Sequence, residues 1–243
     1  MPLIRAIRVL NAMEAGTLSG SALDTLFSDA VRWTEFNVLL TMPGQLRRIL
    51  AASTTRAALA SSAVAGVRIV KSSSARSTLL SDSSFLNELF AGSVAASGIV
   101  ADSEAFGIVL SQVSLRMGMF NSDVMLGALA STPAALTSAR ASSAYAVVSQ
   151  YMTSNTNTAI PGLNAAGSYV LLGVSRSAPS SVGLTVINTR RSGSTRPNTV
   201  GSFNTASTDA TSQTLVTPLV TPFNATPGPT SVTWYFGLLR CDV

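Results

Sequence analysis

A ten-residue period runs through the first half of the chain. From Phe36 to Tyr145 the sequence divides without a gap into eleven units of ten residues, from FNVLLTMPGQ to LTSARASSAY. An Ala/Ser-rich tract without a structural repeat would not keep one column apolar over eleven units. The fourth residue of each unit is the predicted core of the repeat: Leu39, Ile49, Leu59, Ile69, Leu79, Leu89, Ile99, Val109, Met119, Leu129 and Ala139.

Helix-capping residues recur at the seventh and eighth positions of these units. They are Ser53, Ser62, Ser72-Ser73, Asp82-Ser83, Ser93, Asp102-Ser103, Ser122-Asp123, Thr132-Pro133 and Ser142-Ser143, with Pro43 in the first unit. Their side-chain oxygens accept hydrogen bonds from the free N–H groups at a helix start. In one continuous helix, ten residues make about 2.8 turns, so the apolar column would wind around the axis and face no single partner. We therefore expect short helices, stacked as a solenoid over residues 36–150, that stabilise one another.

The segments on either side of the repeat differ from it in pattern. Residues 1–35 predict two short helices, the second with Ser21 as its N-cap. Residues 151–243 are rich in Ser, Thr, Asn, Gly and Pro and contain β-type runs at 168–176, 181–190, 214–223 and 231–240. We predict α and β structure in separate segments, with an antiparallel β domain at the C-terminal end. Residues 190–213 form either a long loop or a pair of edge strands, and Pro218 and Pro222 favour an edge position for their strand.

The residue types present exclude several kinds of active site. The chain has no histidine, which removes Ser-His-Asp and Cys-His systems, and its single cysteine, Cys241, allows no cysteine-based metal cluster. Ser-Lys catalysis would need Lys71, which we predict to be a solvated turn residue. Acids such as Asp82, Asp102 and Asp123 are predicted to stabilise helix starts. We expect no catalytic residue, cofactor or metal, and a depolymerase with paired carboxylates remains a minor alternative.

Charge and hydropathy argue against two classes of partner. Charged residues make up 11% of the chain and the formal net charge is +5, but the arginines are scattered, with only Arg47–Arg48 and Arg190–Arg191 adjacent. Nucleic-acid binding requires a clustered basic face, so we expect no specific nucleic-acid partner. Arg5 and Arg8 interrupt the apolar start, so no secretory signal is expected, and no uncharged apolar run reaches about 18 residues, so no membrane span is expected.

The run Trp234-Tyr235-Phe236 is the main aromatic feature of the β segment. Alternation along a strand places Trp234 and Phe236 on one face, which favours core packing. The alternative is that Trp234 and Tyr235 are surface aromatics that stack on a host glycan.

The stretches ASTTRAALASSAVA, FNSDVMLGALAS and ASTPAALTSARASSAYAVVS resemble the Ala/Ser ten-residue arrays in structural proteins of tailed-bacteriophage virions, among them fibre, collar and head-decoration proteins. The likeness covers about residues 36–150. It implies a non-enzymatic virion component, assembled in the host cytoplasm, that forms a homotrimer and contacts other virion proteins. The alternative function is a receptor- or carbohydrate-binding module whose β domain contacts the host surface.

Overall fold

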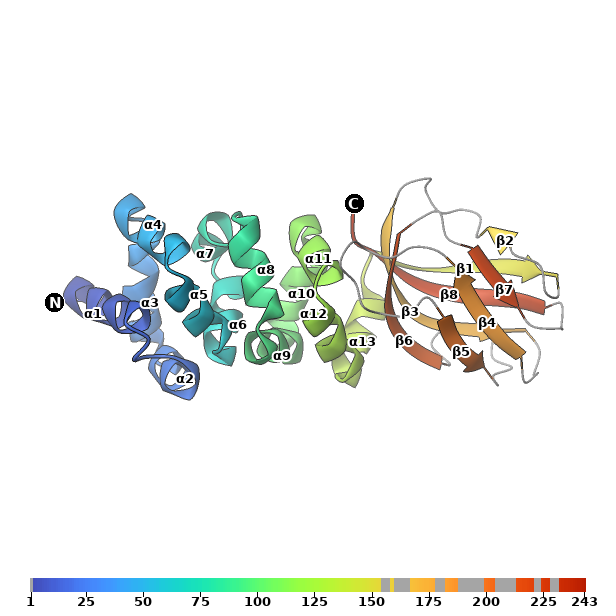
Figure 1. The fold of residues 1–243 in the computed structure, drawn as a ribbon, viewed down its shortest axis with the longest axis horizontal. Coiled ribbons are helices and arrows are strands. Elements are labelled where there is room, and N and C mark those ends of the chain that lie inside the picture. The colour runs from blue at the N-terminus through green and yellow to red at the C-terminus, as the bar shows by residue number, and fades with distance from the viewer. Residues whose placement is uncertain are drawn as a thin grey trace. The chain divides into compact units, whose positions relative to one another are not determined.

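The chain folds into an array of short helices followed by antiparallel β structure, as the sequence predicts. The computed structural model describes residues 2–153, 158–159, 167–177, 182–187, 199–203, 213–220, 224–227 and 232–243. Two compact units divide the chain, Met1–Ala135 and Leu136–Val243 (Figure 1).

Short helices account for nearly all of the first unit, and the last one runs into the second unit. In chain order they are α1 (Pro2–Glu14), α2 (Gly20–Ser28), α3 (Ala30–Leu39), α4 (Pro43–Ala51), α5 (Ser53–Ala60), α6 (Ala63–Lys71), α7 (Ser73–Thr78), α8 (Ser83–Ala91), α9 (Ser93–Ala101), α10 (Ser103–Ser111), α11 (Val113–Phe120), α12 (Asp123–Ala130) and α13 (Pro133–Ala141).

An extended residue at every tenth position interrupts the helical backbone and keeps these helices short. The N-cap residues from α4 to α12 fall at ten-residue intervals and all have extended φ and ψ angles, which end one helix and allow the next to start in a new direction. In five of them the side-chain oxygen accepts a hydrogen bond from the backbone N–H three residues later: Ser62, Ser72, Asp82, Asp102 and Ser122. The predicted caps at these five positions are therefore confirmed. The predicted caps at Ser53 and Ser93 are wrong, because Ala52 and Gly92 occupy the N-cap positions of α5 and α9 and have no side-chain oxygen.

Sets of three successive helices form layers, and these layers stack along the unit (Figure 1). Helix α5 packs against α8 and α8 against α11, while α6 packs against α9 and α9 against α12. Three units of ten residues therefore bring the chain back over itself every thirty residues. At the N-terminal end the extra helix α4 lengthens the first step, so α1 packs on α5 and α2 on α6.

The fourth-position residues form the core of the layers. All eleven, from Leu39 to Ala139, are at most 1% exposed. The tenth-position residues that lie one helical turn before them, such as Ala65 before Ile69 and Phe85 before Leu89, are also buried, except Gln45, which is half-buried.

Small residues let neighbouring layers approach closely. A Cβ added at Gly98 in α9 would lie 2.8 Å from Cβ of Ala63 in α6, and one at Gly92 would overlap the backbone oxygen of Ala60. Layers held this close leave no room for a side chain at either glycine.

The N-terminal segment departs from the predicted two helices. The stretch after α1 contains two helices rather than one, because Asp29 ends α2 and caps α3 by accepting a hydrogen bond from Val31 N–H at 2.8 Å. Ser21 is not the N-cap of α2. That helix starts at Gly20, whose φ of +56° suits glycine and whose N–H donates to Ser61 Oγ.

The described residues of the second unit form two antiparallel four-stranded sheets. The first has the strand order β1-β8-β3-β6 and the second β2-β7-β4-β5. The strands are β1 (Tyr145–Met152), β2 (Thr158–Ala159), β3 (Ser168–Arg176), β4 (Val182–Ile187), β5 (Thr199–Phe203), β6 (Gln213–Val220), β7 (Asn224–Pro227) and β8 (Val232–Arg240).

The edge-strand predictions can be compared with this order. Strand β6, which contains Pro218, lies at an edge, as expected. Proline has no backbone N–H to donate to a second neighbouring strand, and an edge strand has only one neighbour. Residues 199–203 form the edge strand β5 inside the segment left open as loop or strands. Pro222 and the pair Arg190–Arg191 lie outside the described residues.

The first strand begins earlier in the sequence than the predicted β segment. Strand β1 starts at Tyr145, inside the range 36–150 that the sequence assigns to the helical repeat, and pairs along its whole length with β8. The run YAVVSQYM alternates apolar and polar residues only in part, and β8, the strand that fixes its register, lies some eighty residues further along the chain.

Candidate functional site

Most polar side chains of the helical array bind the array itself. Asp24, in the middle of α2, accepts hydrogen bonds from Ser62 Oγ at 2.6 Å and from Val64 N–H at 2.9 Å, and so caps the N-terminus of α6 from the adjacent layer. Ser122, the N-cap of α12, donates through its Oγ to the carbonyl of Phe90 in α8 at 2.7 Å, and so joins two further layers. These groups are used for structure rather than for chemistry.

At three of the turns between successive helices, an arginine side chain makes a hydrogen bond to the end of the preceding helix. The Nη1 group donates to the backbone carbonyl six residues earlier, at the end of the preceding helix, where carbonyls lack helical partners. The pairs are Arg56 with Leu50 at 2.5 Å, Arg76 with Val70 at 2.5 Å and Arg116 with Leu110 at 2.6 Å. Sequence reasoning missed this role. The signal was present, because all three arginines occupy the first position of their ten-residue unit.

Lys71 is held by acids and is not a free turn residue. It ends α6, and its Nζ pairs with Glu104 and lies 3.6 Å from Asp102, both at the start of α10. The hydrogen bond with Glu104 raises the pKa of Lys71 above its ordinary value, which favours the protonated form. A lysine in this state is a poor general base.

The structure separates the two aromatics considered for glycan binding. Trp234 is fully buried and shares the core cluster with Phe236, so a ligand cannot stack on it at the surface. The Arg176 guanidinium lies 5.5 Å from the Trp234 ring centroid, and burial lowers the pKa of this arginine. Tyr235 faces the opposite side of the sheet and is half-buried.

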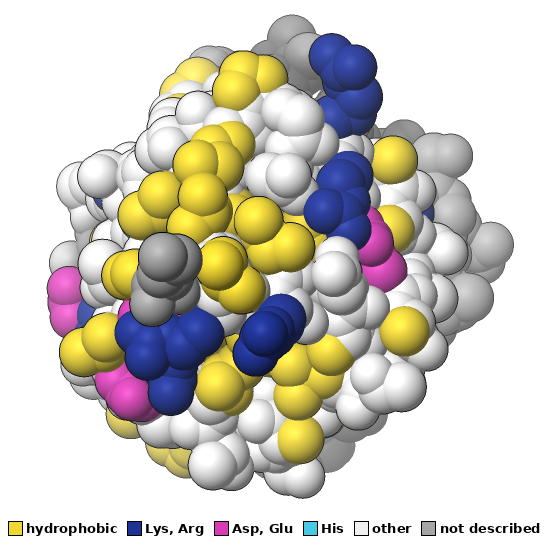
Figure 2. Space-filling view, turned by 90° about the vertical axis from the view of Figure 1, so that its left-hand side faces the viewer, with side chains coloured by type: hydrophobic (Ala, Val, Ile, Leu, Met, Phe, Trp, Pro, Cys, Tyr) yellow, Lys and Arg dark blue, Asp and Glu magenta, His cyan; other side chains and the backbone are white. Residues whose placement is uncertain are grey.

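The N-terminal end of the array is the clearest candidate interaction surface. Figure 2 looks onto this end and shows apolar side chains gathered across it, with arginine or lysine side chains beside them. On α1, Leu3 and Ile4 are 39% and 47% exposed, and Arg5 and Arg8 are exposed as well. We call these four residues the N-terminal face. Terminal repeats of solenoids usually carry a polar outer surface, so an apolar one indicates a contact.

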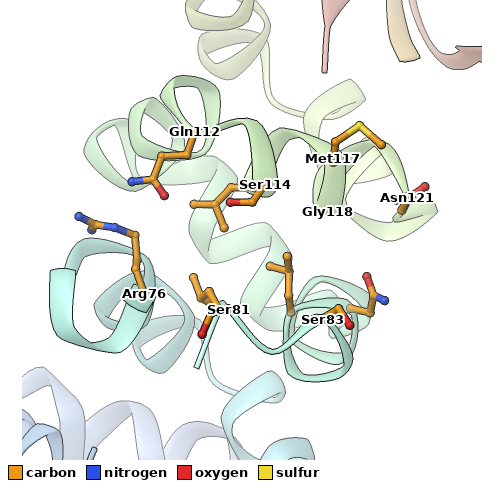
Figure 3. A pocket seen from close by; sticks show the side chains of 12 residues that line it. Arg76, Ser81, Ser83, Gln112, Ser114, Met117, Gly118 and Asn121 are labelled. Atoms are coloured by element: carbon orange, nitrogen blue, oxygen red, sulfur yellow. The ribbon is translucent and has the colours of Figure 1, made fainter. Parts of the chain in front are cut away.

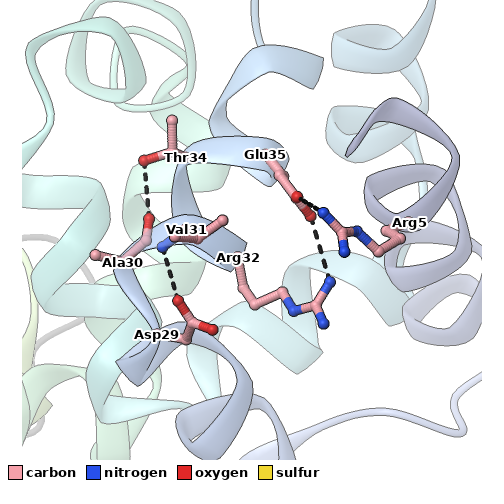
Figure 4. Close-up of polar contacts among 7 residues, drawn as sticks. All are labelled: Arg5, Asp29, Ala30, Val31, Arg32, Thr34 and Glu35. Carbon is pink, nitrogen blue, oxygen red and sulfur yellow. Dashed lines mark hydrogen bonds and ion pairs between the residues drawn. The ribbon is translucent and has the colours of Figure 1, made fainter. Parts of the chain in front are cut away.

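The electrostatics of this face are positive. Arg5 and Arg32, on α1 and α3, both pair with the buried carboxylate of Glu35 (Figure 4). Two guanidinium groups therefore share one acid. Arg8 forms no ion pair with any described residue. The face thus combines aliphatic side chains with positive charge that described acids do not balance.

A second candidate is a groove of about 460 Å³ between the corner of α7 and α8 and helix α11 (Figure 3). Leu80, Leu86 and Met117 supply apolar surface, and Arg76 is the one charged residue among the described residues that line the groove. Asn87, Gln112, Ser114 and Asn121 are among the neutral polar side chains around it.

Among the described residues, no three acidic or cysteine side chains lie close enough together to hold a metal ion. No single helix in that part of the chain is long and apolar enough to cross a bilayer, although the bent pair α8 and α9 meets this test jointly by length and composition.

No protein-family model matches the chain, and no curated protein is significantly similar to it.

Proposed function

We propose that the protein is a non-enzymatic structural component of a tailed-phage virion, a fibre, collar or decoration protein that is assembled in the host cytoplasm. In this proposal it forms a homotrimer and attaches to other virion proteins. The observation that carries the proposal is the N-terminal face, where a layered array presents aliphatic and positively charged side chains to solvent instead of a polar cap.

The use of polar groups elsewhere in the array supports this proposal. Acidic and basic side chains that could serve in catalysis are bound within the array instead. Asp24 and Asp102 cap helices, and Glu88 and Lys71 form ion pairs between layers. The resemblance of the ten-residue repeats to virion proteins supplies the biological setting.

Two measurements test the proposal. Gel filtration with light scattering is expected to give three times the 25.0 kDa mass of one chain, and a stable monomer at every concentration would contradict self-assembly. Mass spectrometry of purified particles, from the phage whose genome encodes the chain, should find it in stoichiometric amount. Its absence from purified particles would refute a virion role.

A charge reversal tests the N-terminal face directly. The variant Ile4→Glu combined with Arg8→Glu should lower incorporation into particles, because it removes both the apolar and the positive character of the face. Val113→Glu is the matched control, since Val113 on α11 is a similarly exposed aliphatic residue, at 42%, outside the face. Equal loss of incorporation in both variants would show that the N-terminal face has no special role.

One observation keeps a glycan-binding β domain as a second candidate. Tyr151 on β1 is 62% exposed and pairs in register with Thr233, so it lies on the same face of the sheet as Tyr235. Two tyrosine rings on one face offer a stacking surface for a sugar. A glycan array that is positive for the wild type and negative for Tyr151→Ala would favour this candidate, and no binding by the wild type would exclude it for the glycans displayed.

A further inference from the structure

Strand β1 lies at the edge of its sheet, and no described strand pairs with its outer side. Edge strands of natural proteins usually carry a charge, a proline or a bulge that prevents pairing with another chain. At the opposite edge of the same sheet, β6 contains Pro218, and its register with β3 shifts after Leu171. Strand β1 has none of these features. Its eight residues, YAVVSQYM, include no charge and no proline, and they pair with β8 in unbroken register.

Hydrogen bonds at the two ends of β8 show which backbone groups of β1 face outward. In an antiparallel pair, successive residues alternate between facing the partner strand and facing away from it. The N–H of Arg240 donates to the carbonyl of Ala144 at 2.8 Å, so even-numbered residues of β1 face β8. Thr233, which lies opposite Tyr151, instead accepts from the N–H of Ser177 on its other side. The residues of β1 whose N–H and C=O groups point to the free edge are therefore Val147, Ser149 and Tyr151.

The outward-facing residues are available to a partner. Their side chains are exposed, Val147 by 49% and Tyr151 by 62%. Their N–H groups donate to no acceptor in the described part of the chain. The carbonyl of Tyr151 accepts only from the amide of Gln150, at 2.7 Å, a surface side chain that a backbone donor can replace. Tyr145 is not part of this free edge, because its N–H already donates to the carbonyl of Ser142 at 3.1 Å.

The free edge is complementary to a second copy of itself. When two such strands run antiparallel about a twofold axis at Ser149, Val147 of each strand lies opposite Tyr151 of the other. Each opposed pair exchanges two hydrogen bonds, so every free N–H on both strands meets a carbonyl. A shift of two residues would instead place Tyr151 opposite Tyr145, whose N–H is already bound.

The side chains of β1 fit the same register. An aromatic residue opposite a β-branched one is a favourable cross-strand pair, and this pairing covers the exposed apolar surface of both Val147 and Tyr151. Since the strand has no charged residue, no like charges meet across the axis. The edge therefore selects a copy of the same strand by its backbone groups and by its side chains.

We propose that two copies of the chain pair through β1, which joins their sheets into one continuous antiparallel sheet. The contact is isologous, with the same residues contributed by both copies. It goes beyond the proposed virion role and is separate from the contacts that would hold a trimer. A contact through three residues of each strand is small, so the pairs should dissociate on dilution and form at high protein concentration.

Sedimentation equilibrium of the full chain over a wide concentration range tests the pairing. Ser149→Pro removes one outward N–H, and it leaves the bonds to β8 intact because even-numbered residues make them. At high concentration the wild type should reach at least twice the mass of Ser149→Pro. The matched control Ser149→Thr keeps the N–H and should pair as the wild type does. Equal masses of wild type and Ser149→Pro at every concentration would overturn the proposal.

A charge exchange at the twofold axis tests the register and does not depend on proline. The two copies of residue 149 would lie about 5.5 Å apart at Cα. Ser149→Lys alone and Ser149→Glu alone should not pair, because like charges directly opposite each other are destabilising. An equimolar mixture of the two should recover the doubled mass. Ala146→Lys is the matched control, since residue 146 is exposed on the same strand but does not lie opposite itself, and it should pair alone.

Failure of the mixture to recover pairing, or an equal loss in Ala146→Lys, would overturn the proposal. Both tests compare masses as a ratio, so they hold whether the unpaired species is one chain or a trimer. A wild type that doubles from 25.0 kDa would support strand pairing and contradict the trimer, whereas a trimer with the same mass in all variants would do the reverse.

Discussion

The close approach of α6 and α9 predicts opposite effects for one substitution at two glycines. Gly98 and Gly107 both lie in helix interiors, one in α9 and the other in α10. Replacing a glycine there by alanine stabilises a helix by about 1 kcal/mol through intrinsic propensity. A Cβ at Gly107 meets no heavy atom within 4 Å, so Gly107→Ala should raise the free energy of unfolding by about this amount.

Gly98→Ala gains the same propensity but is opposed by overlap. Its Cβ would lie 2.8 Å from Cβ, 2.9 Å from Cα and 3.0 Å from the backbone oxygen of Ala63. Alanine has no rotamer that relieves such contacts, so the two helices must separate. Overpacking of this kind costs about 1 to 3 kcal/mol. We expect Gly98→Ala to be less stable than Gly107→Ala by about that amount.

Urea denaturation followed by circular dichroism at helical wavelengths measures the difference. With a slope of about 1 to 3 kcal/mol per molar urea, the two midpoints should differ by about 1 M. A wild-type titration sets the reference for the sign of each change. If both variants shift the midpoint upward equally, the layers are not packed as tightly as the contact between Gly98 and Ala63 requires.

Three further predictions concern stability. Thr55→Val should stabilise the helical unit by about 1 kcal/mol, because Thr55 Oγ1 is buried and has no hydrogen-bond partner among the described residues; a lower urea midpoint would contradict this. Asp24→Ala should destabilise it by about 1 to 2 kcal/mol through loss of the cap on α6, also read from urea midpoints, and no change would disprove the interlayer cap. The pKa of Lys71 is raised in the folded state, so its pair with Glu104 stabilises the fold below pH 10.5 and loses this effect as the pH rises further. The free energies of unfolding of Lys71→Met and wild type should differ by less than about 1 kcal/mol below that pH, because the pair is exposed, and should converge above it. A difference that stays constant with pH would refute the assignment.

Local structure in the array was predictable because its causes are local. A capping side chain and the N–H groups it accepts lie within three residues, and the burial of Ile69 follows from a column that stays apolar. The stacking of α8 on α5 and of α9 on α6 was not predictable. It depends on the angle between successive helices, which backbone φ and ψ values such as those at Ser62 determine and which no residue type specifies.

The candidate sites were only partly predictable for a related reason. Alternation correctly placed Trp234 and Phe236 on one face of their strand, but the side of the sheet that becomes covered depends on strands far apart in the chain. The groove at Arg76 was not predictable because Arg76, Leu86 and Met117 come from helices far apart in the sequence. Which helices become neighbours depends on the layer period, which the structure supplies.

The three-helix layer also limits how the length of such an array can change. An insertion or deletion of thirty residues adds or removes a whole layer and leaves each remaining helix above the same kind of neighbour. A change of ten residues rotates every later helix by one place, so that, for example, the close contacts of α9 with α6 would be exchanged for contacts with α5 or α7. Duplications within the gene should therefore be tolerated in steps of three repeats, and engineered versions of different lengths should be built in the same steps.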